Sequence, residues 1–168
     1  MAQPLSAGVN VFTYGSLMYE AVWARVVRGQ YASARARLAG FRRLAIRNES
    51  YPAVVPDAQA EVLGRLWFGV SPDDLERLDR FEGSEYRRQT VSVTVLPARD
   101  GTSGGTAGGQ PAQPQDPVSA QCYLWLDPAR LLAQPWDEAA FERAHLAGFA
   151  ERHGAPDAPT GDPVRGRP

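Results

Sequence analysis

Lysine is absent from this sequence, so all 18 of its strongly basic residues are arginines. Without a lysine amine, the chain has no group for Schiff-base chemistry and no lysine clamp for phosphate. Histidine and cysteine are scarce: the histidines are His145 and His153, and the single cysteine is Cys122. One cysteine excludes a disulfide within the chain and a cysteine-based metal cluster. Two histidines do not make a histidine-rich site, so we expect no bound metal.

Long apolar runs and a strong net charge are also missing. No run approaches the length that crosses a bilayer, and residues 1–8 have no basic segment followed by an apolar core. We therefore expect no membrane span, no secretory signal and a cytoplasmic protein. A net charge of −1 argues against nucleic acid as a partner, and we interpret the arginines between Arg35 and Arg47 as a solvated sheet face.

Three segments have too few apolar residues to order themselves. They are an N-terminus at 1–8, a loop at 98–117 rich in Gly, Pro, Gln, Ser and Thr, and a tail at 154–168. Strand patterns lie on both sides of the loop, so it joins neighbouring strands rather than two domains. We expect residues 9–153 to form a single domain with a flexible loop at 98–117. The sequence carries no signal for an oligomeric state.

Alternating apolar residues outline most of the expected strands, and helical spacing outlines fewer helices. Ser71 is the clearest helix start, because it is a capping residue followed by Pro72 and, three positions on, by Asp74. Strands outnumber the dispersed helices, which favours an α+β domain of mostly antiparallel strands. The predicted strands are Val9–Thr13, Tyr31–Leu38, Arg42–Ile46, Ala60–Val70, Tyr86–Leu96 and Val118–Leu126, with a loop at Asn48–Pro56 and helices at Glu20–Arg28, from Ser71 to Phe81–Gly83, and at Trp136–Arg152.

A glycine turn follows the first apolar strand and precedes a helix. Successive backbone N–H groups in this turn, from Gly15 to Leu17, can converge on one point, where the helix N-terminus adds partial positive charge. Such a turn can hold a carboxylate or an oxyanion, and glycine permits close approach of the ligand. A structural turn with Ser16 as the helix cap is an equally good interpretation. The segment is too short for a dinucleotide loop, and the sequence contains no G-x-x-x-x-G-K-[ST] motif.

Glu82 stands at the predicted end of a helix. A carboxylate there faces the negative end of the helix dipole, and burial beside Phe81 would raise its pKa further. A glutamate with a raised pKa suits general acid–base catalysis near neutral pH. The alternative is a solvated glutamate in a polar turn. Asp79 and Glu85 are rival acids nearby, and we expect Asp79 to face solvent or to pair with Arg80 or Arg87.

Several short motifs in a fixed order resemble the γ-glutamylcyclotransferase-like superfamily, in particular its AIG2-like branch. The resemblance runs from about Val11 to about Phe149. It includes Tyr14-Gly15-Ser16-Leu17, Tyr51-Pro52-Ala53-Val54-Val55-Pro56, Gly64-Arg65-Leu66-Trp67-Phe68, Leu78-Asp79-Arg80-Phe81-Glu82-Gly83 with Glu85-Tyr86-Arg87-Arg88 after it, Tyr123-Leu124-Trp125, and the helix with Trp136, Phe141 and Phe149. Each motif is short, and it is their common order that makes the match specific.

The resemblance implies a small mixed, mostly antiparallel β-barrel flanked by helices, with a cavity at its mouth. It implies that Glu82 is the catalytic acid and base. It also implies that the segment after the first strand binds the substrate. The substrate-binding candidates are Tyr14, Gly15, Ser16, Leu17, Met18 and Tyr19, together with Tyr51 and Tyr86, for which aromatic packing at the barrel mouth is the alternative role.

The reaction implied by the resemblance needs no cofactor. The α-amine of a small γ-glutamyl substrate attacks its own γ-carbonyl, releasing an amine and 5-oxoproline, and one carboxylate moves the protons. The residues leave the identity of the amine open. Two alternatives remain at this point: a non-catalytic module of the same fold that binds a small carboxylate or a peptide, and an acyl hydrolase using Ser16 with His145. No G-x-S-x-G motif surrounds Ser16, which disfavours the hydrolase.

Overall fold

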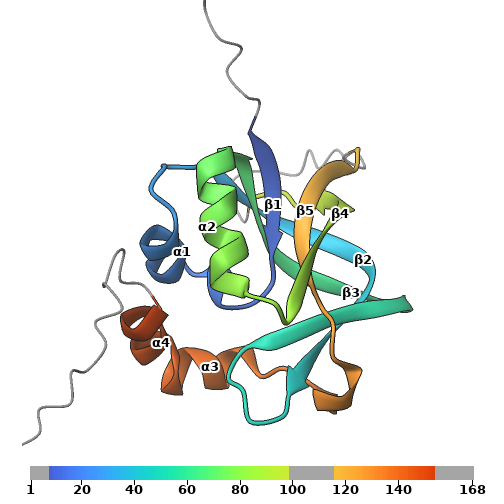
Figure 1. Cartoon of the computed structure of the whole chain (residues 1–168). Helices are drawn as coiled ribbons and strands as arrows, with labels where there is room; N and C mark the ends of the chain where they lie inside the picture. Colours follow the sequence, from blue (N-terminus) through green and yellow to red (C-terminus); the bar gives the residue numbers. More distant parts are fainter. Residues whose placement is uncertain (1–7, 99–115, 154–168) are drawn as a thin grey trace, which may run out of the picture.

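Strand pairing closes the sheet of this protein into a barrel. The computed structural model describes residues 8–98 and 116–153 (Figure 1). Its strands are β1 (Val9–Thr13), β2 (Ser33–Ile46), β3 (Pro52–Val70), β4 (Tyr86–Val95), β5 (Val118–Trp125) and β6 (Leu131–Pro135). Its helices are α1 (Glu20–Val26), α2 (Pro72–Glu82), α3 (Glu138–Ala144) and α4 (Leu146–His153), with short 3₁₀ turns η1 (Ser16–Met18) and η2 (Pro128–Arg130).

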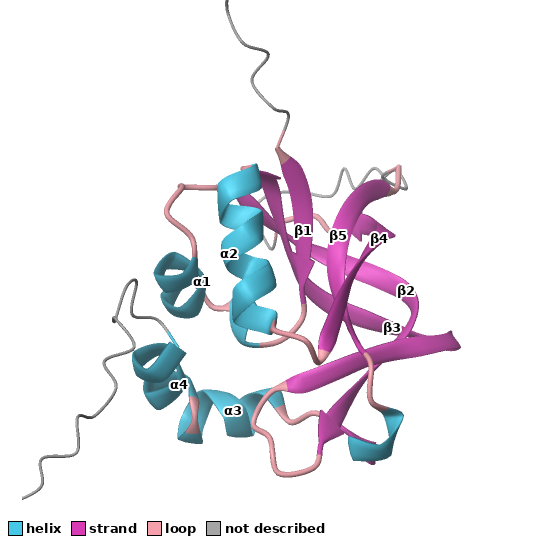
Figure 2. Cartoon of the chain, in the orientation of Figure 1, coloured by secondary structure: helices cyan, strands magenta, loops and turns pink. Residues whose placement is uncertain are grey.

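The strand order explains the closure. Neighbouring strands follow the order β3-β1-β5-β4-β2-β6, and an additional β2–β3 pairing joins the first five strands into a ring. The β1–β5 pair is parallel, whereas every other pair is antiparallel. The predicted α+β fold, a small mixed and mostly antiparallel barrel flanked by helices, is therefore confirmed. Figure 2 shows α1, α2 and α4 together on one side of the barrel.

Three apolar clusters hold this arrangement together, and alternation along β1 divides the two larger ones. Phe12 packs inside the barrel with Leu38, Leu66 and Cys122. Its neighbour Val11 faces the helices, in a cluster where the Trp23 and Trp67 rings stack with centroids 4.2 Å apart. Together these layers bury both faces of β1 and deliver its C-terminal end to a fixed position between barrel and helices.

The long strands differ from the prediction. The two strands expected on either side of Gly40 are one strand, β2, with a register shift between Ala39 and Phe41. Gly40 has φ +82°, a conformation that glycine adopts without strain, so β2 continues through the register shift, where the extra residues 57–60 lie on β3. The expected loop at 48–56 contributes its last residues to β3, because Val54 is fully buried and pairs with β2.

The C-terminal part of the chain also differs from the predicted secondary structure. Strand β6 was not predicted; it is short, mostly exposed and paired only with β2. The single helix expected at 136–152 is broken at His145 into α3 and α4. Residues eight apart in one straight helix would lie roughly 12 Å apart, whereas the break brings the Phe141 and Phe149 rings to 5.6 Å. Helix α1 ends at Val26 rather than Arg28.

The remaining predictions concern disordered segments and membrane-spanning helices. The disordered segments predicted at 1–8, 98–117 and 154–168 lie almost entirely outside the described residues. Among the helices of residues 8–98 and 116–153, none combines the length and apolar character needed to span a bilayer.

Candidate functional site

Two adjoining hollows lie where the turn after β1 meets the C-terminal end of α2. The inner hollow holds about 330 Å³ of space, part of it open to solvent, and the outer one about 520 Å³. Both are lined by Ser16, Tyr51 and Glu82. The inner hollow is completed by Phe12, Thr13, Tyr14, Gly15, Leu17, Pro52 and Tyr123. The outer one is completed by Phe81, Glu85, Tyr86 and Phe149.

Glu82 is the last residue of α2, and it lines both hollows. Gly83 ends the helix with φ 71° and ψ −167°, a backbone region that is almost exclusive to glycine. Part of the Glu82 residue is exposed, but burial of its carboxyl end raises the pKa from 4.5 to about 8. The described residues provide this carboxyl group with no hydrogen bond or ion pair. It is therefore free to exchange a proton with a ligand.

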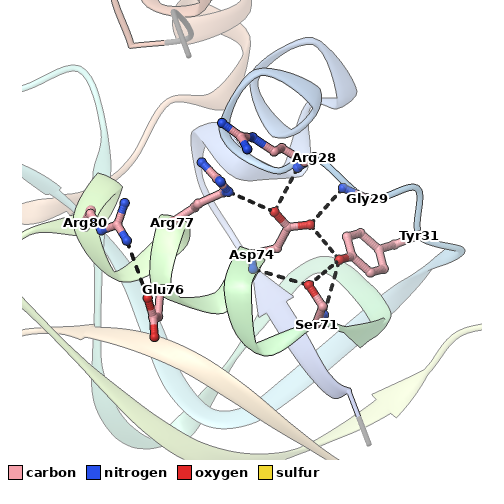
Figure 3. Close-up of polar contacts among 8 residues, drawn as sticks. All are labelled: Arg28, Gly29, Tyr31, Ser71, Asp74, Glu76, Arg77 and Arg80. Carbon is pink, nitrogen blue, oxygen red and sulfur yellow. Dashed lines mark hydrogen bonds and ion pairs between the residues drawn. The ribbon is translucent and has the colours of Figure 1, made fainter. Parts of the chain in front are cut away.

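The N-terminal end of α2 determines where Glu82 lies, and a buried carboxylate anchors it (Figure 3). Ser71 accepts a hydrogen bond from the Asp74 N–H, which confirms the predicted cap. The Asp74 carboxylate accepts the N–H groups of Arg28 and Gly29, both at 2.8 Å, and the Tyr31 hydroxyl at 2.6 Å. These bonds tie α2 to the segment after α1 and so orient the whole helix.

The turn after β1 forms the wall opposite Glu82. Its own hydrogen bonds use the N–H groups of Met18, bonded to the Gly15 carbonyl at 3.0 Å, and Tyr19, bonded to the Ser16 carbonyl at 3.2 Å. The N–H groups of Ser16 and Leu17 have no acceptor among the described residues, and both residues line the inner hollow. Two backbone donors are thus available to an anionic ligand group.

Gly15 is required by close packing rather than by its backbone angles. Its φ is −129°, but a Cβ atom there would lie 2.8 Å from Cδ of Pro52. The alternative interpretation of Ser16 as a helix cap is wrong: Gly15 is the cap of η1 and Tyr19 that of α1, and neither cap makes a side-chain hydrogen bond.

Met18 and Tyr19 lie away from Glu82. Successive side chains of a 3₁₀ turn point in different directions, so only the first part of the turn faces the two hollows. Met18 and Tyr19 line a separate hollow next to Arg65, and the Tyr19 hydroxyl donates to Glu142 at 2.9 Å. Of the eight substrate-binding candidates, the structure brings Tyr14, Gly15, Ser16, Leu17, Tyr51 and Tyr86 to the two hollows around Glu82.

Two of the three tyrosines, Tyr14 and Tyr86, use their hydroxyl groups to bond to a neighbouring strand at the barrel mouth. The Tyr14 hydroxyl donates to the carbonyl of Tyr123, and that of Tyr86 donates to the carbonyl of Pro52 at 2.9 Å. Burial raises the pKa of both, and it raises that of Tyr51 to about 12, helped by a hydrogen bond with Glu49. All three therefore stay protonated near neutral pH and act as hydrogen-bond donors.

Tyr123 is a site residue that the sequence did not single out. It lines the inner hollow, and its hydroxyl donates to the Asp79 carboxylate at 2.7 Å. Asp79 pairs with Arg88 at 3.0 Å instead of with Arg80 or Arg87, because β4 and β5 place Arg88 directly opposite Tyr123. The available signal was strand alternation, which puts Tyr123 on the face opposite Cys122, toward α2.

The pair needed for a serine hydrolase is not assembled. Ser16 is buried at the hollows, whereas His145 is exposed at the junction of α3 and α4 and lines neither hollow. The described residues contain no hydrogen bond between them. Within that same part of the chain, no cluster of three or more His, Cys, Asp or Glu residues could hold a metal ion.

The closed barrel with a buried glutamate at its mouth defines the class: it has the fold of gamma-glutamyl cyclotransferases. A solved protein named gamma-glutamyl cyclotransferase superposes with a TM-score of 0.55 over 92% of each chain, at 18% identity, a likeness of fold. This chain belongs to the gamma-glutamyl cyclotransferase, AIG2-like family, whose model matches residues 11–139.

Relatives from Arabidopsis thaliana agree with this assignment. The chain is 31% identical to AIG2-like protein D over 143 residues, which is 83% of each protein. It is also similar to an Arabidopsis thaliana protein of known solution structure, with a TM-score of 0.61 and 27% identity over 90% of this chain and 82% of the other.

Proposed function

We propose that this protein is a cyclotransferase that acts on γ-glutamyl amides, releasing an amine and 5-oxoproline without a cofactor. The supporting observation is Glu82, a carboxyl group with a pKa of about 8 that faces a hollow whose opposite wall offers free backbone N–H groups. Family membership supports the same reaction class.

The substrate supplies its own nucleophile in this reaction. Its α-amine nitrogen forms a bond to its γ-carbonyl carbon, and the amide C–N bond to the leaving amine then breaks. The inner hollow holds the substrate in a bent conformation, with its α-amine close to its own γ-carbonyl. This proximity replaces the nucleophile that a protein side chain would otherwise supply. The N–H groups of Ser16 and Leu17 bind the α-carboxylate or the oxyanion that develops on the γ-carbonyl oxygen.

Glu82 moves the protons. Its carboxylate takes one from the α-ammonium group, which frees the nitrogen lone pair for attack, and then gives it to the nitrogen of the leaving amine. The attacking nitrogen loses a second proton as the ring amide forms, and this proton goes to the departing amine, which leaves as an ammonium ion. With a pKa of about 8, roughly one tenth of the Glu82 carboxyl groups are ionised at neutral pH. The rate should therefore rise toward pH 8, because the ionised form is the one that accepts the first proton.

The test is a panel of γ-glutamyl amines incubated with the protein, with 5-oxoproline as the readout. Glu82→Gln keeps the size of the side chain and removes its proton chemistry, so we expect a rate loss of about 10²-fold or more. Glu76→Gln, an exposed carboxylate on the same helix, serves as the matched control and should retain full activity. Unchanged turnover by Glu82→Gln would remove Glu82 from the mechanism.

The same panel separates the alternatives. Thermal stabilisation by γ-glutamyl amines without release of 5-oxoproline would identify a binding protein instead of an enzyme. Inactivation by a serine-directed phosphonate would favour a hydrolase that uses Ser16.

A further inference from the structure

The outer hollow has walls of aromatic rings. Tyr51, Phe81, Tyr86 and Phe149 all line it. The rings pack edge to face or tilted, with centroids 6.4 Å apart for Tyr51 and Tyr86, 6.4 Å for Tyr51 and Phe149, and 6.2 Å for Phe81 and Phe149. Surfaces of this kind attract an ammonium group to the ring faces and receive the methylene chain that carries it.

The charge of the outer hollow has one sign. Its acidic lining residues are Glu82, whose carboxyl group is mostly protonated at neutral pH, and Glu85, and among the described residues no arginine lines it. Arg130 lies behind Glu85, where it pairs at 2.5 Å with both Glu85 and Glu49 and stacks on the Trp125 ring. One arginine shared between two carboxylates leaves this rim with a net negative charge.

The position of the outer hollow gives it a role in the proposed reaction, on which this inference rests. With the γ-glutamyl group held in the inner hollow, the bond that breaks lies beside Glu82, which the two hollows share. The leaving amine then extends into the outer hollow, past Phe81 and Tyr86, toward Glu85 at the rim.

We propose that the outer hollow selects the leaving amine by charge, favouring an amine that carries a second ammonium group over a neutral one and disfavouring one that ends in a carboxylate. The aromatic walls and Glu85 both attract the distal cation, while a distal carboxylate is repelled by the Glu85 carboxylate. Glu85 is thereby a specificity residue, distinct from Glu82 in function.

Three substrates of equal chain length test this selection: the γ-glutamyl amides of putrescine, butylamine and γ-aminobutyric acid. They share a four-carbon chain and end in an ammonium, a methyl and a carboxylate group. We expect kcat/KM to fall in that order, by roughly two- to five-fold between the first two, since Glu85 is partly exposed and its attraction is screened. The difference should shrink as salt is added. Equal values, or a preference for the carboxylate, would overturn the proposal.

Glu85→Gln isolates the contribution of the rim carboxylate. The ratio of kcat/KM for the putrescine amide to that for the butylamine amide should fall toward one, while Arg130 keeps its partner Glu49. Glu76→Gln changes the net charge of the protein equally but lies outside both hollows, paired with Arg80 (Figure 3), so it should leave the ratio unchanged. A ratio that responds equally to both variants, or to neither, contradicts a role for Glu85.

Binding measurements distinguish failure of this inference from failure of the proposed reaction. Calorimetric titration of Glu82→Gln with the three amides reports their order of affinity without turnover. The predicted order of affinity with no 5-oxoproline from the wild-type protein would overturn the cyclotransferase proposal and support charge selection. Turnover of all three amides with equal kcat/KM would support the cyclotransferase proposal and overturn charge selection. The absence of any binding would overturn both proposals.

Discussion

Glu82 combines two conditions that raise the free energy of an ionised carboxylate. It ends α2, where the helix carbonyls carry partial negative charge, and its half-buried side chain has no hydrogen bond or ion pair among the described residues. Burial holds its pKa at about 8 in the folded protein, against about 4.5 when the carboxyl is solvated. The folded state therefore keeps a proton that the unfolded chain has already released.

This difference predicts how stability depends on pH. The free energy of unfolding should fall as pH rises from about 4.5 to about 8, because the folded protein must either hold the proton or bury a charge. Glu82→Gln has nothing to titrate, so its stability relative to the wild type should rise across that window by about 2 to 5 kcal/mol. Urea unfolding at several pH values measures the difference.

The control for this measurement is Glu76→Gln, whose carboxylate is largely exposed and should leave the pH profile of the wild type unchanged. Parallel profiles for the wild type and Glu82→Gln would show that the Glu82 carboxyl group is solvated in the folded protein, and that the sequence-based alternative of a polar turn is correct.

At the scale of elements, the placement of Glu82 depends on the opposite end of α2. Asp74 is only 3% exposed, and burial alone would raise its pKa. Hydrogen bonds from Tyr31, Arg28 and Gly29, with the Arg77 guanidinium at 3.3 Å, outweigh that effect and lower the pKa of Asp74. A buried charge with this many donors fixes the helix to the segment after α1.

Replacing this anchor should therefore destabilise the protein. Asp74→Asn loses the charge and at least one of the hydrogen bonds, and we expect the free energy of unfolding at neutral pH to drop by about 2 to 4 kcal/mol. Because the folded pKa is lowered, the wild type loses this advantage as pH falls below about 4, so the two proteins should converge in acid. Chemical denaturation at neutral and acidic pH tests both statements.

Asp73→Asn is the matched control, since it removes an exposed carboxylate from the same first turn of α2. A loss of stability as large as that of Asp74→Asn would mean that the helix N-terminus needs negative charge in general, and not the specific contacts of Asp74.

At the scale of the whole molecule, closure of the barrel isolates its interior from solvent. Cys122 lies inside on β5, fully buried beside Phe12 and Leu38, and burial raises the pKa of its thiol far above the usual range. The thiolate is the reactive form, so this cysteine should be inert toward thiol reagents in the native protein.

Labelling of Cys122 should accordingly report opening of the barrel. As the denaturant concentration rises, we expect the fraction of Cys122 modified by a thiol reagent to increase over the same range in which the fluorescence of the four tryptophans changes. Cys122→Ala serves as the unlabelled control. Rapid labelling in native buffer, well before the fluorescence changes, would show that the barrel opens locally at β5.

Sequence reasoning succeeded where the determining interactions are local. The Ser71 cap, the alternation of β4 and the glycine turn after β1 depend on residues a few positions apart, and all three are present. It was incomplete where distant segments decide: the register shift at Gly40, strand β6 and the break at His145 satisfy pairing or packing with other parts of the chain.

For the site, the sequence by itself indicated Glu82 and the turn from Tyr14 to Leu17, because a carboxylate at a helix end and a glycine turn are local features. Only the tertiary structure decided that these two segments face one another, that Tyr123 joins them, and that Met18 and Tyr19 do not. The physical reason is that burial and strand register depend on the whole barrel: the helix end provides the carboxylate, and the surrounding fold sets its pKa.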